Sequence, residues 1–548
     1  MTRRPHVDRR AVLKALGASG FLAALGGSAS HAQTSVSGTH AGAALRLQGD
    51  PFTCGVASGA PSADGMVLWT RLDARSLPGT TDGRPLEVVP VLWEVAHDEQ
   101  FRQVVQSGQA TATQALAYAV HVEPVGLPSD RWYFYRFRVG DATSRVGRTR
   151  TLPRAQSAVG SMRLAYASCQ KWEDGHFAAW RHMAAEGVDG VIFLGDYLYE
   201  YPALKSRVRV PPGGWILTLD DYRARYALYK SDADLQAMHA AAPWWVIWDD
   251  HEVQNDYAGM QAGNSGNASP PVEDFAARRA AAYQAYFENM PLRRSALMEG
   301  LAGLVRGAEL RIYNHARLGQ LASLLMLDTR QYKDPQPCMA PGSRGSAFFT
   351  PAACKRWSAP ERSMLGRAQE QWVDQTLASP VVQGTRWTLV GQTTLLGQRD
   401  MGTGQDVRLW NDGWDGYPAA RQRLVASLQR HQVPNPVVLG GDVHENWVGH
   451  VLADYSSLDS ASIGVEFCGT GITSHASSSA RTAEQLARNP HFIYADAAHR
   501  GYGMMDLTPE RLTVRLRGLD DATRKDSGIQ TLARFEVEAG KPQVLRVL

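Results

Sequence analysis

Beyond about residue 160, short apolar runs alternate with stretches of helical character, and this alternation limits the folds open to the chain. Short apolar runs bounded by polar turns are typical of strands that are buried on both faces. Strands that alternate with helices form a sheet covered by those helices. We therefore expect an α/β domain over residues 155–548. The expected strands are 163–168, 191–194, 245–248, 321–327, 387–390 and 437–439, and the expected helices are 177–186, 273–289 and 366–378.

Residues 51–152 have a different pattern, in which apolar residues alternate with period two in short runs separated by turn residues. The runs lie at 66–69, 89–95, 120–122 and 132–139, and no long helical pattern separates them. This spacing is typical of an antiparallel β-sandwich. We expect a separate N-terminal β-sandwich domain here, preceded by a flexible polar leader over residues 33–50.

The first 32 residues have the pattern of an export signal. Arg9 and Arg10 precede a mildly apolar stretch over 15–25, and Ser30 and Ala32 suit a cleavage site after residue 32. The paired arginines resemble a twin-arginine signal, which predicts the twin-arginine translocase as a partner and a periplasmic or secreted protein. Because twin-arginine export carries folded proteins, it suits one that loads a metal before export.

The apparent basicity of the chain comes from its N-terminal segment. Residues 1–32 hold five of the 57 Lys and Arg and one of the 54 Asp and Glu, so removing them takes the formal net charge from +3 to −1. Nothing in this balance calls for a nucleic-acid partner. No apolar run reaches the roughly 20 residues of a spanning helix, so we expect no stable membrane insertion.

The five cysteines are interpreted on the expectation that the protein is exported. Cys338 and Cys354 lie 16 positions apart in a loop rich in Pro, Gly and Ser, and are either a disulfide or two free thiols. Cys54, Cys169 and Cys468 remain. Cys468 is expected to be a packed core thiol.

Residues that can bind metals follow directly after four of the expected strands, the position at which α/β proteins place ligand sites. Each cluster alone is better explained by a turn, a helix cap or a core thiol. Together they supply thiolate, phenolate, carboxylate and imidazole ligands and indicate a multinuclear metal centre. Two loops rich in Gly, Asn and Asp, 260–270 and 400–418, are candidate rims. The clusters are Ser168-Cys169-Gln170, Gly195-Asp196-Tyr197-Leu198-Tyr199-Glu200, Asp249-Asp250-His251-Glu252 and Gly440-Gly441-Asp442-Val443-His444-Glu445-Asn446.

The chemistry of these side chains suggests which ions they hold. Asp196 can bridge two cations, and Tyr199 can return to the same centre if the loop turns tightly. Cys169 and Tyr199 lose a proton on binding, so they favour a strongly Lewis-acidic ion such as Fe³⁺. Carboxylate-rich positions favour Ca²⁺ or Mg²⁺. His251, beside Asp250, is placed to protonate a leaving alkoxide or to orient a phosphate.

The ordered set of motifs resembles the PhoD-type alkaline phosphatases, extracytoplasmic relatives of the calcineurin-like metallophosphoesterases. The resemblance covers about residues 51–505. It implies a four-layer α/β phosphoesterase domain, a preceding fibronectin III-like sandwich, and release of phosphate from small phosphate esters by an iron and calcium centre. The motifs are Ala-Ser-Cys-Gln at 167–170, Gly-Asp-x-x-Tyr-Glu at 195–200, Trp-Asp-Asp-His-Glu at 248–252, Leu-Asp-Thr-Arg-Gln-Tyr at 327–332 and Gly-Gly-Asp-Val-His at 440–444.

The resemblance also implies residue roles. It gives metal-ligand roles to Cys169, Asp196, Tyr199, Asp250, Asp442 and His444, and the acid or phosphate-contact role to His251. A further ligand histidine of the superfamily would fall near Gln392, where this chain has none.

Three weaker candidates lie outside these motif roles. Arg330 can hold phosphate with two hydrogen bonds or form a structural salt bridge. Asn255 and Asp256 serve either a calcium ion or a loop cap. The segment 222–226, with Tyr222, Arg223 and Arg225, is expected to be an ordinary helix face.

The leading hypothesis is an exported metal-dependent phosphomonoesterase with possible diesterase activity. A phosphodiesterase, including a phospholipase D-like enzyme, is the closest alternative, since the same two-metal geometry serves both reactions. A non-catalytic, calcium-stabilised binding protein is a distant one.

Overall fold

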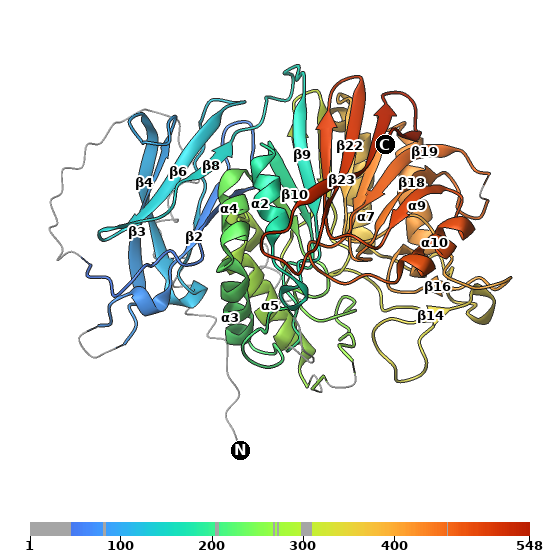
Figure 1. Cartoon of the computed structure of the whole chain (residues 1–548), viewed down its shortest axis with the longest axis horizontal. Coiled ribbons are helices and arrows are strands. Elements are labelled where there is room, and N and C mark those ends of the chain that lie inside the picture. Colours follow the sequence, from blue (N-terminus) through green and yellow to red (C-terminus); the bar gives the residue numbers. More distant parts are fainter. Residues whose placement is uncertain are drawn as a thin grey trace, which may run out of the picture.

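The computed structural model describes residues 45–548 except 81–83, 203–207, 267–268, 271–272, 298–308 and 458. The predicted signal peptide and residues 33–44 of the predicted leader lie outside the described residues. Figure 1 shows the N-terminal strands at one end of the molecule, helices α2–α5 beside them, and the C-terminal strands at the other end. The predicted α/β content is confirmed.

A ten-stranded sheet runs through the middle of the molecule in the order β24-β23-β22-β21-β9-β10-β11-β1-β2-β5. Strands β9, β10 and β11 are parallel neighbours at its centre. Its strands are β1 (Val56–Gly59), β2 (Val67–Arg71), β5 (Ala119–Val122), β9 (Met162–Ala167), β10 (Gly190–Leu194), β11 (Trp244–Ile247), β21 (Gly501–Leu507), β22 (Arg511–Leu519), β23 (Ile529–Glu538) and β24 (Val544–Arg546).

A seven-stranded sheet has the order β12-β13-β15-β17-β19-β18-β20. Strands β13, β15, β17 and β19 are parallel neighbours. Its strands are β12 (Asn314–Leu318), β13 (Ala322–Met326), β15 (Trp387–Gly391), β17 (Pro436–Gly440), β18 (Asn446–Leu452), β19 (Ser462–Cys468) and β20 (Phe492–Asp496).

The two large sheets pack face to face and carry helices on their outer faces (Figure 1). Ile192 of β10 and Leu389 of β15 belong to one buried apolar cluster, which joins the sheets. Trp180 of α2 lies 6.0 Å from Phe193, ring centre to ring centre, on the outer face of the first sheet. Helices α7 and α9 share a second cluster with Val438 of β17. The main helices are α2 (Ala178–Ala185), α3 (Leu219–Lys230), α4 (Ala233–Ala241), α5 (Phe275–Asn289), α7 (Gly366–Ala378), α9 (Pro418–Arg430) and α10 (Ser479–Arg488).

The N-terminal segment contributes to two sheets. Strands β3 (Val88–Ala96), β4 (Val104–Thr113), β6 (Trp132–Val139), β7 (Ala142–Thr143) and β8 (Gly147–Arg150) form a five-stranded antiparallel sheet. Its apolar face shares a buried cluster with β1, β2 and β5, exemplified by Val91 and Leu68. Because β1 pairs with β11 in parallel, the ten-stranded sheet continues from this segment into the rest of the chain. The predicted boundary at residue 152 stays a prediction.

Two predictions about cysteines are resolved by the structure. Cys338 and Cys354 form a disulfide, with their Cα atoms 5.7 Å apart. Their loop carries β14 (Phe348–Phe349), which pairs with β16 (Leu409–Trp410). Cys468 is fully buried at the end of β19, as a packed core thiol should be.

The segment 222–226 lies in α3, but Arg225 on it is buried rather than part of an exposed face.

Candidate metal centre

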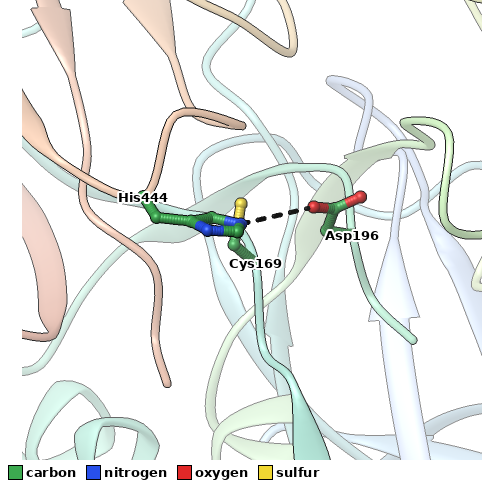
Figure 2. A group of neighbouring side chains, drawn as sticks. All are labelled: Cys169, Asp196 and His444. Carbon is green, nitrogen blue, oxygen red and sulfur yellow. Dashed lines mark ion pairs between the residues drawn. The ribbon is translucent and has the colours of Figure 1, made fainter. Parts of the chain in front are cut away.

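Three predicted ligands from distant strand ends meet at one point. Cys169 follows β9 and Asp196 follows β10, whereas His444 follows β17 of the other sheet. One ligand atom from each lies within 4.8 Å of the other two. Figure 2 shows the three side chains converging, with His444 Nε2 3.9 Å from Asp196 Oδ2. The facing sheets therefore bring a thiol, a carboxyl and an imidazole together.

The backbone at these positions is left-handed. The φ angles are +57° at Cys169, +57° at Asp196, +65° at Asp442 and +60° at His444. Residues with a side chain seldom adopt such angles, and residues held in this region cluster at functional sites. The chain turns sharply after each strand, which keeps the side chains at the strand ends.

Tyr199 returns to the same place three residues after Asp196. Its hydroxyl donates to Asp196 Oδ2 at 2.9 Å and lies 3.1 Å from His444 Nε2 and 2.7 Å from Ser474 Oγ. The tight turn on which the Asp-x-x-Tyr argument depends is present in the structure. Tyr199 thus adds a phenol oxygen to the thiol, carboxyl and imidazole.

Asp196 also belongs to a second group of potential ligands, with Asp250 and His251. His251 Nδ1 lies 2.7 Å from Glu200 Oε2, and Glu200 is fully buried. Burial alone would lower the pKa of His251, but the charges of Glu200 and Asp250 outweigh it and raise the pKa well above the usual value. The imidazole therefore retains a proton at a position beside the shared carboxylate.

A third group of potential ligands consists of Asp250, Asp256 and Asp412. Asp412 lies in the loop 400–418, which the sequence marked only as a candidate rim. Its carboxylate accepts from Lys333 Nζ at 2.5 Å and from Gln336 Nε2 at 2.7 Å. Sequence reasoning singled out neither Asp412 nor Glu200 by role. Asp412 belongs to no motif, whereas Glu200 is the last residue of the Gly-Asp-x-x-Tyr-Glu motif, which gave it no role.

Arg330 lies among carboxylates rather than at an open surface. Its guanidinium donates to Asp249 and, at 2.6 Å, to Asp412 Oδ2, and lies 3.6 Å from Asp250 Oδ2. Only 1% of the side chain is exposed. The salt bridge that the sequence left open is present, and the phosphate-holding role stays a prediction.

Asp442 accepts a hydrogen bond from the segment after β15, where the expected histidine is missing. Its Oδ2 accepts from Thr394 Oγ1 at 2.7 Å. Gln392 Oε1 accepts from Trp414 Nε1 at 3.0 Å, so this side chain is engaged in the protein interior. Neutral side chains therefore occupy the position where the superfamily would place a ligand histidine.

The donor set fits cations. Among the described residues, the buried oxygens Asp196 Oδ1 and Asp250 Oδ1 have no hydrogen-bond partner, which is costly for a carboxylate. Burial, and after it the charge of Asp196, raises the pKa of the Cys169 thiol. Burial, and after it the charge of Asp249, raises the pKa of Asp442. Cations at this position would compensate these groups and favour their charged forms.

His444 is oriented for binding through Nε2. Its Nδ1 lies 2.7 Å from the carbonyl oxygen of His475, which accepts a hydrogen bond and therefore places the proton on Nδ1. Burial lowers the pKa of His444 to about 3. The neutral ring then presents its Nε2 lone pair to Asp196 and Tyr199.

Family models match both parts of the chain: "PhoD-like phosphatase" over residues 164–516 and "PhoD-like phosphatase, N-terminal domain" over residues 38–153. The chain belongs to the PhoD-like phosphatase family. Alkaline phosphatase D of Bacillus subtilis (strain 168) is 41% identical to this PhoD-like phosphatase over 511 residues, which cover 91% of this chain and 83% of that protein. A solved structure of PhoD is 40% identical, with a TM-score of 0.83, and covers 91% of this chain and 93% of that one. The family resemblance predicted from the motifs is confirmed.

Proposed function

We propose that this PhoD-like phosphatase is an exported, metal-dependent enzyme that hydrolyses phosphate monoesters. The observation that carries the proposal is the position of Asp196, which is shared by two groups of potential ligands. Cys169 and His444 belong to one of these groups, and Asp250 and His251 belong to the other. A carboxylate between two unlike ligand sets is the arrangement that a mixed two-metal phosphoesterase needs.

In this proposal the ligands divide according to their chemistry. Cys169, Tyr199 and His444 hold Fe³⁺ together with Asp196, because a thiolate and a phenolate prefer a strongly Lewis-acidic ion. Asp250 and Asp442 serve Ca²⁺ through carboxylate oxygens. When bound, the metal pair supplies Lewis acidity that polarises the phosphoryl group and makes water a nucleophile. The arrangement of the two large sheets and their outer helices as the four layers of a metallophosphoesterase is part of the same proposal.

His251 acts on the leaving group. Glu200 accepts from His251 Nδ1, from the backbone N–H of Asn255 at 2.8 Å and from Ser265 Oγ at 2.6 Å, so its carboxylate is fixed. Glu200 thereby fixes the imidazole and leaves Nε2 to give a proton to the departing oxygen. General acid catalysis of this kind contributes about 10²–10⁴-fold.

The export part of the proposal rests on the sequence of residues 1–32 and on the disulfide. Disulfides persist outside the cytoplasm, which suits the bond between Cys338 and Cys354. No helix in the described part of the chain has the length and hydropathy of a membrane span. We propose delivery by the twin-arginine translocase to the periplasm or beyond.

Elemental analysis of the mature protein, purified without chelators, tests the metal assignment. We expect about one iron per chain with calcium alongside. Zinc or manganese without iron would contradict the thiolate and phenolate argument. A folded protein without metal or turnover would overturn the proposal.

Steady-state kinetics test the reaction. We expect higher kcat/KM for an aryl phosphate than for its bis-ester, whereas equal or greater diester turnover would identify a phosphodiesterase. Asp196→Asn should abolish turnover and leave the fold intact. The matched control Asp521→Asn, on a surface turn, should change neither. If Asp196→Asn melts the fold and spares turnover, the centre is structural.

A further inference from the structure

A row of aromatic rings leads outward from the metal-ligand cluster. The ring of Tyr199 lies 4.1 Å from that of His251, measured between centroids. Tyr201 packs on His251 with its ring centroid at 5.3 Å and an interplanar angle of 66°, and Trp215 packs on Tyr201 at 5.5 Å and 75°. Tyr199 and His251 are buried, whereas Tyr201 and Trp215 are only partly buried. The row therefore runs from the proposed acid to the protein surface.

A lysine lies beside the same rings. Lys171 Nζ is 5.5 Å from the centroid of Tyr199 and 5.3 Å from that of Tyr201. Its ion pair with Asp174 is long, at 3.8 Å, and 18% of the lysine side chain is exposed. Within the described residues, the ammonium group donates no hydrogen bond. It can therefore donate hydrogen bonds to an anionic group next to Tyr201.

The outer rings are held in place before any ligand arrives. The hydroxyl of Tyr201 donates to Asn255 Oδ1 at 2.9 Å. The carbonyl oxygen of Tyr201 accepts from Arg225 Nη1 at 2.9 Å, so the buried arginine of α3 anchors the segment that carries the ring. A ring fixed in this way loses little conformational freedom when a ligand packs on it.

The position of these residues relative to His251 identifies the part of the substrate that they meet. His251 gives its proton to the leaving oxygen in the proposed reaction, so the leaving group lies on the side of His251. Tyr201 packs against His251 and Trp215 packs against Tyr201, so these two rings are the aromatic groups that lead outward from the proposed acid. A planar ring stacks on such side chains, whereas a short alkyl group gains little from them.

We propose that Lys171, Tyr201 and Trp215 form a leaving-group subsite that favours phosphate esters of ring-bearing alcohols, above all those that carry a second anionic group, as nucleoside bisphosphates do. The two aromatic side chains bind the planar ring, and Lys171 binds the second anionic group. This inference rests on the proposed phosphatase function and specifies its substrate class.

The test compares kcat/KM of the metal-loaded protein for three esters: glycerol 3-phosphate, adenosine 5′-monophosphate and adenosine 3′,5′-bisphosphate. In Trp215→Leu, the preference for the monophosphate over glycerol phosphate should fall about tenfold, the usual size of one stacking contact. Trp215→Phe keeps a ring and should restore most of the preference. Tyr201→Leu is a second variant on the same contact and should act in the same direction.

The role of Lys171 is tested by the ratio of kcat/KM for the bisphosphate to kcat/KM for the monophosphate. In Lys171→Met, the preference for the bisphosphate over the monophosphate should fall about fivefold, as for a partly exposed ion pair. The matched controls Trp132→Leu, in β6, and Lys541→Met, on the surface, should change neither ratio. Metal content and urea unfolding of each variant identify any general damage.

The possible outcomes separate this inference from the function on which it rests. If the ratios are unchanged in Trp215→Leu, Tyr201→Leu and Lys171→Met while all three esters are hydrolysed, the subsite is wrong and the phosphatase proposal stands. If the metal-loaded parent protein hydrolyses none of the esters, the phosphatase proposal is wrong, and the subsite proposal that rests on it is wrong too.

Discussion

Replacing Arg330 with methionine should destabilise the fold and change the response of the protein to calcium. The guanidinium contacts Asp249, Asp250 and Asp412, and the exposed fractions of the four side chains are between 1% and 4%. Methionine has a similar length and removes the charge. The three carboxylates would then lie close together in the interior with less compensation, and breaking a buried ion pair from one side is strongly destabilising.

The size of the loss in stability depends on which positive charges remain beside each carboxylate. Asp412 keeps Lys333 Nζ at 2.5 Å, so most of the loss falls on Asp249 and Asp250. We expect the free energy of unfolding to fall by about 3–5 kcal/mol. A divalent cation can replace the lost positive charge among these carboxylates. Added Ca²⁺ should therefore stabilise Arg330→Met more than it stabilises the parent protein.

Urea unfolding with and without Ca²⁺ measures both effects, since urea does not screen charges as an ionic denaturant does. Arg421→Met is the matched control, because Arg421 is also buried and pairs with Asp415 at 2.7 Å. It should lower stability and leave the Ca²⁺ response at the parental level. If Arg330→Met unfolds at the parental urea concentration and only raises KM, the guanidinium serves the substrate and this reasoning is wrong.

Three further predictions concern the thiol ligand, the disulfide and a buried histidine. Cys169→Ser should lower bound iron and turnover by at least about tenfold, since even residues that only contact metal ligands contribute that much. Full retention of iron in elemental analysis would show that this thiol is a core residue and not a metal ligand. Reduction of the Cys338–Cys354 bond, whose residues are 16 positions apart, should lower stability in urea by about 3 kcal/mol, and an unchanged midpoint with dithiothreitol would contradict the loop-entropy argument. Burial lowers the pKa of His491 to about 4, below the value of about 6.5 in an unfolded chain. The unfolded state therefore binds more protons as the pH falls from about 6.5 to 4, and stability drops through that window. His491→Gln should reduce this drop in urea titrations at several pH values, and a slope equal to that of the parent would refute the assignment.

Much of the secondary structure could be predicted because its signals are local. The apolar run expected at 191–194 lies in β10 (Gly190–Leu194), and the helix expected at 366–378 is α7 (Gly366–Ala378). The strands β21, β22 and β23 were not predicted, although all three are in the ten-stranded sheet. The continuation of that sheet through β1 and β11 was not predicted either, since it depends on a pairing between residues far apart in the chain.

For the site, the sequence by itself determined which chemical groups are present and that each follows a strand: a thiol at Cys169, a carboxyl at Asp196, a phenol at Tyr199 and an imidazole at His444. Only the tertiary structure decided which of them meet. The meeting point depends on two sheets packing face to face, and on tight turns with left-handed backbone angles after the strands. The same long-range packing placed Arg330 among carboxylates, because partners distant in the chain leave no local pattern.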